Sequence, residues 1–240
     1  DCTLLSVGIS DEADPKHRRL LMDRFGLEEG SKGLACNGDK EDKMEDGDEE
    51  ILPPDGAKDF RANAARMNFL SLDCPDIQFP SKNCSREMSC PKVGSWKVLK
   101  KLVRYLVGRG AVVWKFEWQD EVDESDVVTD SDWGGNSKDR RSTSGGVWRI
   151  GKHTIKTWSA TQGAYALSSA EAELYGMIEG VTRAKGLVSL ARELGFVDLS
   201  SVLRLGTDSS AAKSFVCRRG LGRMRHLEIR DLWLQKEVSE

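Results

Sequence analysis

The stretch that decides the fold is Val127-Val128-Thr129-Asp130-Ser131-Asp132-Trp133. Its β-branched run is typical of a strand, and that run ends in the carboxylate Asp130. Two later stretches also place an acid at the boundary of an element. Ser168–Leu174 opens a long segment with helical spacing, and in Leu205–Ser210 a short apolar run ends at Asp208. The three stretches predict an α/β fold whose topology brings these acids together.

The period of the apolar residues changes along the chain. Helical spacing covers 14–29, 57–72 and 91–107, and alternation with a period of two begins at Trp114. Further elements are expected as strands at 127–130, 145–150, 154–158 and 202–207, a helix at 169–195 and a helix from Ser209. This order predicts a mixed sheet flanked by helices, built from a meander and then a parallel crossover.

The net charge of −3 over 240 residues hides an asymmetry. From Asp126 onward there are 17 Lys and Arg against 14 Asp and Glu, a net charge of +3. The remaining 36 − 17 = 19 basic and 39 − 14 = 25 acidic residues give −6 upstream. A polyanionic partner is therefore expected for the C-terminal half only.

Several classes of protein are not indicated by the composition. No apolar run approaches the ~20 residues that span a bilayer, so no membrane partner is expected. The six cysteines form no CxxC pair and there are only three histidines, which argues against a zinc site. The acid-rich stretch 36–56 predicts a disordered linker, with an acidic docking tail as the alternative.

We expect Asp130, Glu173 and Asp208 to converge on a divalent-metal site. Mg²⁺ prefers carboxylate and water oxygens, and two cations ~4 Å apart can activate a water and neutralise a leaving oxygen. Mg²⁺ or Mn²⁺ is therefore the expected cofactor, for phosphodiester hydrolysis. Taken alone, Asp208 could instead cap a helix and Asp130 could sit in a turn.

The helix carboxylate requires a choice between two glutamates. Residues two apart on a helix point about 200° apart, so only one of them can face the sheet. Glu173 lies in line with an apolar stripe through Met177, whereas Glu171 lies in line with a mostly polar one. We therefore expect Glu173 at the site and Glu171 near the helix N-terminus, where negative charge is favoured. A structural role is expected for Asp132.

Basic residues near these acids are candidate contacts to a phosphate backbone. Such contacts give affinity without sequence specificity. The candidates are Arg140, Arg141, Lys213, Arg218, Arg219, Arg223 and Arg225. A hairpin turn is the alternative reading of the loop that holds Arg140 and Arg141.

The motifs resemble the ribonuclease H domain of copia-type LTR retrotransposon polyproteins. The resemblance is carried by Thr129–Trp133, Asp139–Gly145, Ala166–Leu174, Thr207–Ala212 and Arg225–Arg230, in the family's order and spacing. Upstream, Asp73–Ile77 and Val98–Leu106 are similar to the C-terminal end of the same family's reverse transcriptase.

The resemblance implies a set of expectations. It makes Asp130, Glu173 and Asp208 metal ligands, the fold a five-stranded mixed sheet flanked by helices, and the substrate the RNA strand of an RNA–DNA hybrid. It also implies an intracellular setting (cytoplasm, virus-like particle or nucleus) and the rest of the Pol polyprotein as partner. The expected organisation is a reverse-transcriptase remnant at 1–35, the linker at 36–56, a helical reverse-transcriptase segment at 57–110 and a ribonuclease H-like domain at 111–240.

One departure from the family pattern leaves activity open. The family carries a fourth catalytic Asp on a final strand and helix, which should follow a helix at His226–Glu237, but the sequence ends at Glu240. The domain is therefore expected to lack its last strand and helix. Glu228 is expected to lie in a helix and to have a supporting structural role, so it does not replace the missing ligand. The alternatives are an inactive relic that binds nucleic acid without cutting, and an integrase core, for which the order of the acids is unfavourable.

Overall fold

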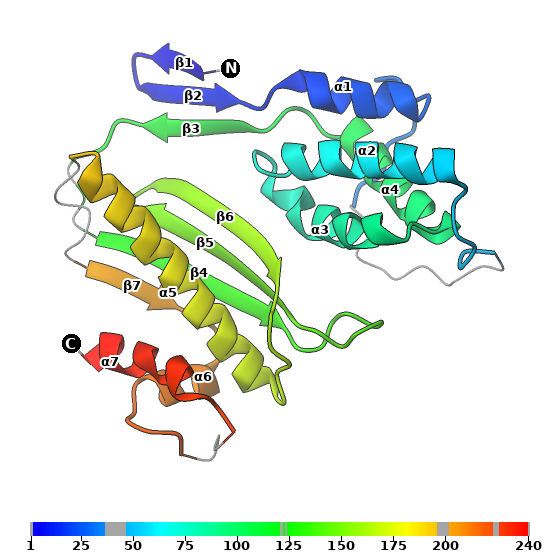
Figure 1. Ribbon diagram of the computed structural model, residues 1–240. Coiled ribbons are helices and arrows are strands. Elements are labelled where there is room, and N and C mark those ends of the chain that lie inside the picture. The colour runs from blue at the N-terminus through cyan, green and yellow to red at the C-terminus, as the bar shows by residue number, and fades with distance from the viewer. Residues whose placement is uncertain are drawn as a thin grey trace. The chain divides into compact units, whose positions relative to one another are not determined.

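The computed structural model describes residues 2–36, 47–120, 122, 124–195, 202–222 and 226–239 (Figure 1). The chain divides into two compact units, Asp1–Phe116 and Glu117–Glu240.

The first unit is built on helices that share one apolar core. The helices are α1 (Pro15–Arg24), α2 (Pro54–Leu70), α3 (Gln78–Arg86) and α4 (Val93–Val107), with short 3₁₀ turns at Pro75–Ile77 and Glu87–Ser89. Leu21, Phe60, Cys84 and Leu99, one from each helix, are buried in the same cluster. Apolar residues at helical spacing on each element explain this packing.

The first helix is shorter than the sequence predicts. Asp14 caps α1 by accepting a hydrogen bond from the backbone N–H of Lys16 at 2.8 Å, as expected. The helix ends at Arg24, however, and the prediction that it reaches residue 29 is wrong. Gly26 takes a left-handed conformation, with φ of +62°, just after the cap residue. This conformation ends helices because glycine adopts it without a steric penalty.

A three-stranded sheet accompanies these helices. Its order is β1 (Cys2–Leu5), β2 (Gly8–Glu12), β3 (Val113–Glu117), and β1 and β2 are antiparallel. The strand expected at Trp114 is present as β3. We expect this strand to open the second domain at residue 111, but it pairs with β2, so it belongs to the sheet of the first unit. Alternation identifies a strand without naming its partner.

The acid-rich stretch is ordered at its C-terminal end. Residues 37–46 of the linker predicted at 36–56 lie outside the described residues. After them, Asp48 forms an ion pair with Lys97 of α4, with 2.8 Å between Oδ1 and Nζ, and Ile51 forms a β-bridge with the residue before α4. The prediction of disorder is therefore wrong for this part, because basic side chains of α4 neutralise its acids.

The second unit contains a four-stranded mixed sheet of order β6-β5-β4-β7. The strands are β4 (Glu124–Asp132), β5 (Thr143–Ile150), β6 (His153–Thr161) and β7 (Val202–Gly206). Strands β4, β5 and β6 form an antiparallel meander, and β7 joins β4 in parallel after a helical crossover. The predicted α/β fold with a mixed sheet flanked by helices is confirmed, and this arrangement is consistent with a ribonuclease H-like fold.

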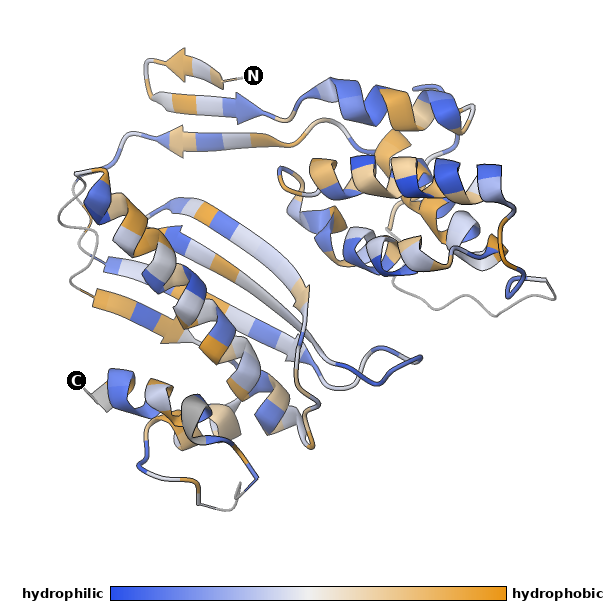
Figure 2. Cartoon of the chain, in the orientation of Figure 1, coloured by the Kyte–Doolittle hydropathy of each residue, from blue (hydrophilic) through white to orange (hydrophobic). Residues whose placement is uncertain are grey.

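The crossover helix α5 (Ser169–Glu193) packs directly on β4. A Cβ atom at Gly180 would lie 2.5 Å from Thr129 Cγ2 and 2.8 Å from Val127 Cγ1, so this close approach requires glycine. Apolar and polar residues alternate along the helix (Figure 2). The apolar ones face the sheet and the last helices, with Met177 among the buried residues. The start of α5 is thereby held over one end of the sheet.

Two short helices complete the second unit. They are α6 (Ser210–Val216) and α7 (Trp233–Ser239), the latter preceded by a 3₁₀ turn at Ile229–Leu232. Phe215 of α6 and Leu234 of α7 share a core cluster with Leu174 of α5. No helix among the described residues is long and apolar enough to cross a bilayer.

Candidate metal centre

Two of the three predicted acids lie at the same edge of the sheet, near the carboxyl ends of β4 and β7. Strands β4 and β7 are parallel, and their last paired residues are Val128 and Gly206. Asp130 and Asp208 each lie two residues beyond that pair. Because parallel strands present their carboxyl ends together, this edge is where an α/β sheet gathers ligands. Asp208 is not itself the cap of α6, since Ser209 fills that place by accepting a hydrogen bond from the N–H of Ala212.

The third acid comes from the second turn of α5. Glu173 is buried, with 6% of its surface exposed. Its Oε1 accepts hydrogen bonds from the backbone N–H of Ser131, at 3.0 Å, and from the Ser131 hydroxyl, at 2.8 Å. The Thr207 hydroxyl lies 3.4 Å from its other oxygen, Oε2. These contacts come from β4 and from the end of β7, so they fix the carboxylate between the two strand ends.

Side-chain oxygens of Asp130, Glu173 and Asp208 all lie within 4.8 Å of one another. The pKa of Glu173 is raised, first because burial disfavours its charged form, while the two Ser131 hydrogen bonds oppose the shift. The charges of Asp130 and Asp208 raise the same pKa further. Like charges held together in this way favour a bound cation.

The donor set fits a hard divalent cation. All three groups offer carboxylate oxygens, which Mg²⁺ and Mn²⁺ prefer. Among the described residues, no Lys or Arg forms an ion pair with any of the three acids. In the same part of the chain this trio is the one group of three or more acids, histidines or cysteines that is close enough to hold a metal.

Asp132 is engaged in local structure, as the sequence predicts. Its Oδ1 accepts a hydrogen bond from the backbone N–H of Thr143, the first residue of β5. A Cβ atom at Gly135 would lie 2.3 Å from Asp132 Oδ2, so the turn after β4 folds tightly over this carboxylate. Asp132 therefore shapes the turn beside the metal centre.

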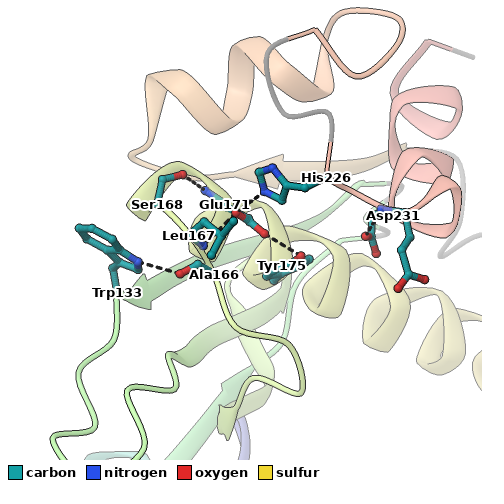
Figure 3. Close-up of polar contacts among 9 residues, drawn as sticks. Trp133, Ala166, Leu167, Ser168, Glu171, Tyr175, His226 and Asp231 are labelled. Atoms are coloured by element: carbon teal, nitrogen blue, oxygen red, sulfur yellow. Dashed lines mark hydrogen bonds and ion pairs between the residues drawn. The ribbon is translucent and has the colours of Figure 1, made fainter.

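The placement predicted for Glu171 is wrong in one respect. This residue was assigned to the polar stripe at the helix N-terminus, but it is buried, with 1% of its surface exposed. Its carboxylate accepts hydrogen bonds from the Leu167 N–H at 2.9 Å and the Tyr175 hydroxyl at 2.8 Å. His226 Nε2 lies 2.8 Å from Glu171 Oε2 (Figure 3). His226, which is distant in sequence, covers this stripe. Helical periodicity does not reveal such a contact.

Sequence reasoning thus missed the role of His226. The histidine brings the C-terminal segment against Glu171 in the first turn of α5. A shallow pocket of about 280 Å³ is lined by His226 together with Tyr175 and Glu179 of α5. The only sequence signal for this contact is that the histidine falls in one of the motifs quoted above.

Glu228 is not helical, which corrects the prediction for that position. It is the extended residue before the 3₁₀ turn, with φ of −80° and ψ of 153°. Its backbone N–H donates to Asp231 Oδ2 at 3.2 Å. A helix predicted to begin at His226 therefore begins later, because this hydrogen bond caps the turn in which Asp231 lies.

The predicted phosphate-contact residues divide into two groups by their environment. Arg140, Lys213 and Arg219 are exposed, whereas Arg141 is half-buried. Arg218 lies over the Phe215 ring and donates a hydrogen bond within its own loop. The candidates Arg223 and Arg225 lie outside the described residues. The exposed residues Arg140, Lys213 and Arg219 follow closely after Asp130 or Asp208 along the chain.

The chain is similar to one region of transposon polyproteins. It is 26% identical over 186 residues, 75% of its length, to the retrovirus-related Pol polyproteins from transposons RE2 and RE1 of Arabidopsis thaliana. It is also 26% identical over 168 residues to the Pol polyprotein from transposon TNT 1-94 of Nicotiana tabacum.

The matched region is a small part of each relative. The chain spans 12% of the length of these Pol polyproteins. No protein-family model matches the chain, and no solved structure matches it. The similarity fits a chain that is one piece of a longer polyprotein. It therefore supports the expectation that the rest of a Pol polyprotein is a partner.

Proposed function

We infer that the second unit is a ribonuclease H-type endonuclease, which hydrolyses the RNA strand of RNA–DNA hybrids. The observation that carries this proposal is the convergence of Asp130, Glu173 and Asp208 at the carboxyl ends of β4 and β7. The similarity to transposon Pol polyproteins supports a nucleic-acid substrate.

Each acid has a distinct part in this proposal. Asp130 and Asp208 would hold divalent cations from the two strand ends, and Glu173 would complete the set from α5. Bound Mg²⁺ or Mn²⁺ supplies an activated water and neutralises charge on the leaving oxygen. Ser131 orients Glu173 through its two hydrogen bonds, so the carboxylate needs little reorganisation when a cation binds.

The exposed cations beside the acids would hold the substrate. Arg140 on the β4–β5 turn, with Lys213 and Arg219 on and after α6, can contact phosphates without reading sequence. An RNA–DNA hybrid exposes 2′-hydroxyls in its shallow minor groove, which distinguish the strand to be cut. Binding should therefore weaken as salt is added.

The proposal is tested first by metal-dependent melting of the full chain. Mg²⁺ or Mn²⁺ at a hundredfold excess over its dissociation constant should stabilise the second unit by about 2.7 kcal/mol. Asp130→Asn should abolish this stabilisation. Asp126→Asn, on the same strand four residues earlier, is the matched control and should keep it. Equal melting of the wild type in Mg²⁺ and in EDTA would contradict the site.

The second test measures cleavage of a labelled RNA–DNA hybrid beside duplex DNA of the same sequence. The expected result is metal-dependent cutting of the RNA strand, lost in Asp130→Asn. A second candidate function, nucleic-acid binding without cutting, is favoured by one observation. The described residues bring together three carboxylates, whereas the family resemblance implies four. Metal stabilisation and hybrid binding without cleavage would select that candidate.

A further inference from the structure

Two exposed aromatic side chains lie on the segments that follow Asp130 and precede α5. Trp133 follows Asp130 by three residues and has 57% of its surface exposed, and Tyr165, before the start of α5, has 55% exposed. Strand residues advance ~3.4 Å each, so the Trp133 backbone lies within about 10 Å of that of Asp130. Exposed aromatic side chains offer faces on which nucleic-acid bases can stack. We call Trp133 and Tyr165 the aromatic platform.

The platform is held rigidly from both sides. The Trp133 indole N–H donates to the backbone carbonyl of Ala166 at 3.0 Å. The next residue, Leu167, donates its backbone N–H to the buried Glu171 carboxylate. Figure 3 shows Trp133 reaching this segment on one side and Glu171 holding it on the other. Little conformational entropy is therefore lost when a ligand binds.

The ring of Tyr165 is held in place by the side chain of Arg141. The Arg141 guanidinium lies over the Tyr165 ring, 5.0 Å from its centroid. The same guanidinium donates a hydrogen bond to the backbone carbonyl of Gln162 at 3.3 Å. Arg141 was a predicted phosphate contact, but these contacts give it a second role, because it supports one face of the aromatic ring.

The charge around the platform favours a polyanion. The loop that follows Trp133 carries Lys138, Arg140 and Arg141 against the single acid Asp139, so its net charge is 3 − 1 = +2. Aromatic faces combined with flanking cations are the features by which proteins hold single-stranded nucleic acid. A double helix offers stacked bases whose faces are already covered, so the rings can stack only on unpaired bases.

We propose that the aromatic platform binds unpaired bases of a nucleic-acid strand whose backbone continues toward the metal centre. In this arrangement Trp133 and Tyr165 stack on bases that flank the hybrid, and Arg140 contacts their phosphates. The proposal rests on the proposed function for its substrate class. It adds a subsite that would favour hybrids with a single-stranded extension over blunt hybrids.

The test is fluorescence anisotropy of the full chain with labelled oligo(dT), performed in EDTA so that no cutting occurs. Trp133→Ala and Tyr165→Ala should each weaken binding about tenfold. Trp118→Ala, which removes an indole with 58% exposure elsewhere in the second unit, is the matched control and should bind like the wild type. The affinity of every variant for a blunt DNA duplex of equal length should stay within threefold of the wild-type affinity.

A conservative variant separates stacking from folding. Trp133→Phe keeps an aromatic face and loses the N–H that bonds Ala166, so its affinity should fall between those of the wild type and Trp133→Ala. Unchanged oligo(dT) affinity in both alanine variants would overturn the proposal, and so would an equal loss for oligo(dT) and duplex. Melting curves of each variant exclude loss of fold as the cause.

Failure of the platform and failure of the proposed function give different results. If Mg²⁺ stabilises the wild type and hybrids are cut while the alanine variants bind oligo(dT) normally, the platform is wrong and the nuclease proposal stands. If the variants lose oligo(dT) affinity but no metal effect and no cutting occur, the platform stands without the nuclease.

Discussion

The two units of the chain differ in whether their acidic side chains are buried. In the first unit, partly exposed acids form ion pairs with basic side chains, such as Asp59 with Arg24 and Asp48 with Lys97. The second unit buries two carboxylates from a single turn of α5, Glu171 and Glu173. A buried carboxylate is unfavourable unless donors or cations compensate it.

The two buried glutamates are compensated differently. Glu171 receives protein donors from three segments of the second unit. One oxygen of Glu173 accepts a hydrogen bond from the Ser131 hydroxyl, and the carboxylates of Asp130 and Asp208 lie close by. Glu171 is therefore expected to stabilise the fold, whereas burial of Glu173 beside two other acids is expected to lower stability at the candidate metal centre. Among its described residues, the first unit has no buried acidic side chain.

The largest expected effect tests whether the first unit depends on its own core. Phe60 is fully buried on α2, so Phe60→Ala should lower the free energy of unfolding of that unit by about 3–5 kcal/mol. Urea unfolding measures this change. Lys58→Ala, at an exposed position of the same helix, should stay within about 0.5 kcal/mol of the wild type. If Phe60→Ala also removes the metal stabilisation of the second unit, the units are not independent.

The next largest effect concerns Glu171. Glu171→Ala leaves buried donors of Leu167 and Tyr175 without their acceptor, which should lower the free energy of unfolding of the second unit by about 2–3 kcal/mol. Glu179→Ala is the control, because Glu179 is half-buried and pairs only with Arg183 one turn away. Equal losses in the two variants would show that the buried contacts of Glu171 add nothing.

Glu173 should behave in the opposite way. Glu173→Gln keeps an oxygen to accept from Ser131 and removes a charge that Asp130 and Asp208 repel. The melting temperature without metal should therefore equal or exceed that of the wild type, while stabilisation by Mg²⁺ is lost. Glu171→Gln should retain the Mg²⁺ effect. A marked loss of stability in metal-free Glu173→Gln would remove the distinction between the two glutamates.

The smallest effect belongs to the surface pairs of the first unit. Asp59→Asn breaks the ion pair with Arg24 but keeps an oxygen that can accept from Asn63, whose amide lies 2.9 Å from Asp59. The loss should be at most about 1 kcal/mol, as for exposed ion pairs, and smaller still in 1 M salt. Urea titrations at low and high salt measure it. A larger, salt-independent loss would contradict the view of these acids as solvated surface groups.

Much of this architecture follows from local patterns. Alternation at β3 and β4 identifies strands because successive side chains face opposite sides. The apolar stripe through Met177 selects Glu173 over Glu171 for the side of α5 that faces the sheet. Asp130 lies near the end of β4 and Asp208 just after β7, and parallel pairing of those strands brings the two acids to one edge.

Other features depend on contacts that no local pattern contains. The partner of β3 is β2, more than a hundred residues earlier, and alternation carries no information about it. The end of α1 follows from one glycine with a positive φ. Order after residue 47 follows from ion pairs and backbone hydrogen bonds to the beginning of α4.

The sequence by itself determined the strands of the mixed sheet and its crossover helix, and it indicated which three acids would lie close together, because each inference rests on the spacing of neighbouring residues. Only the tertiary structure decided that Glu171 is buried against His226 and that Trp133 is held by Ala166. The physical reason is that burial depends on which distant segments cover a side chain. Periodicity can say which residues share a face, but the chain must fold before that face acquires neighbours.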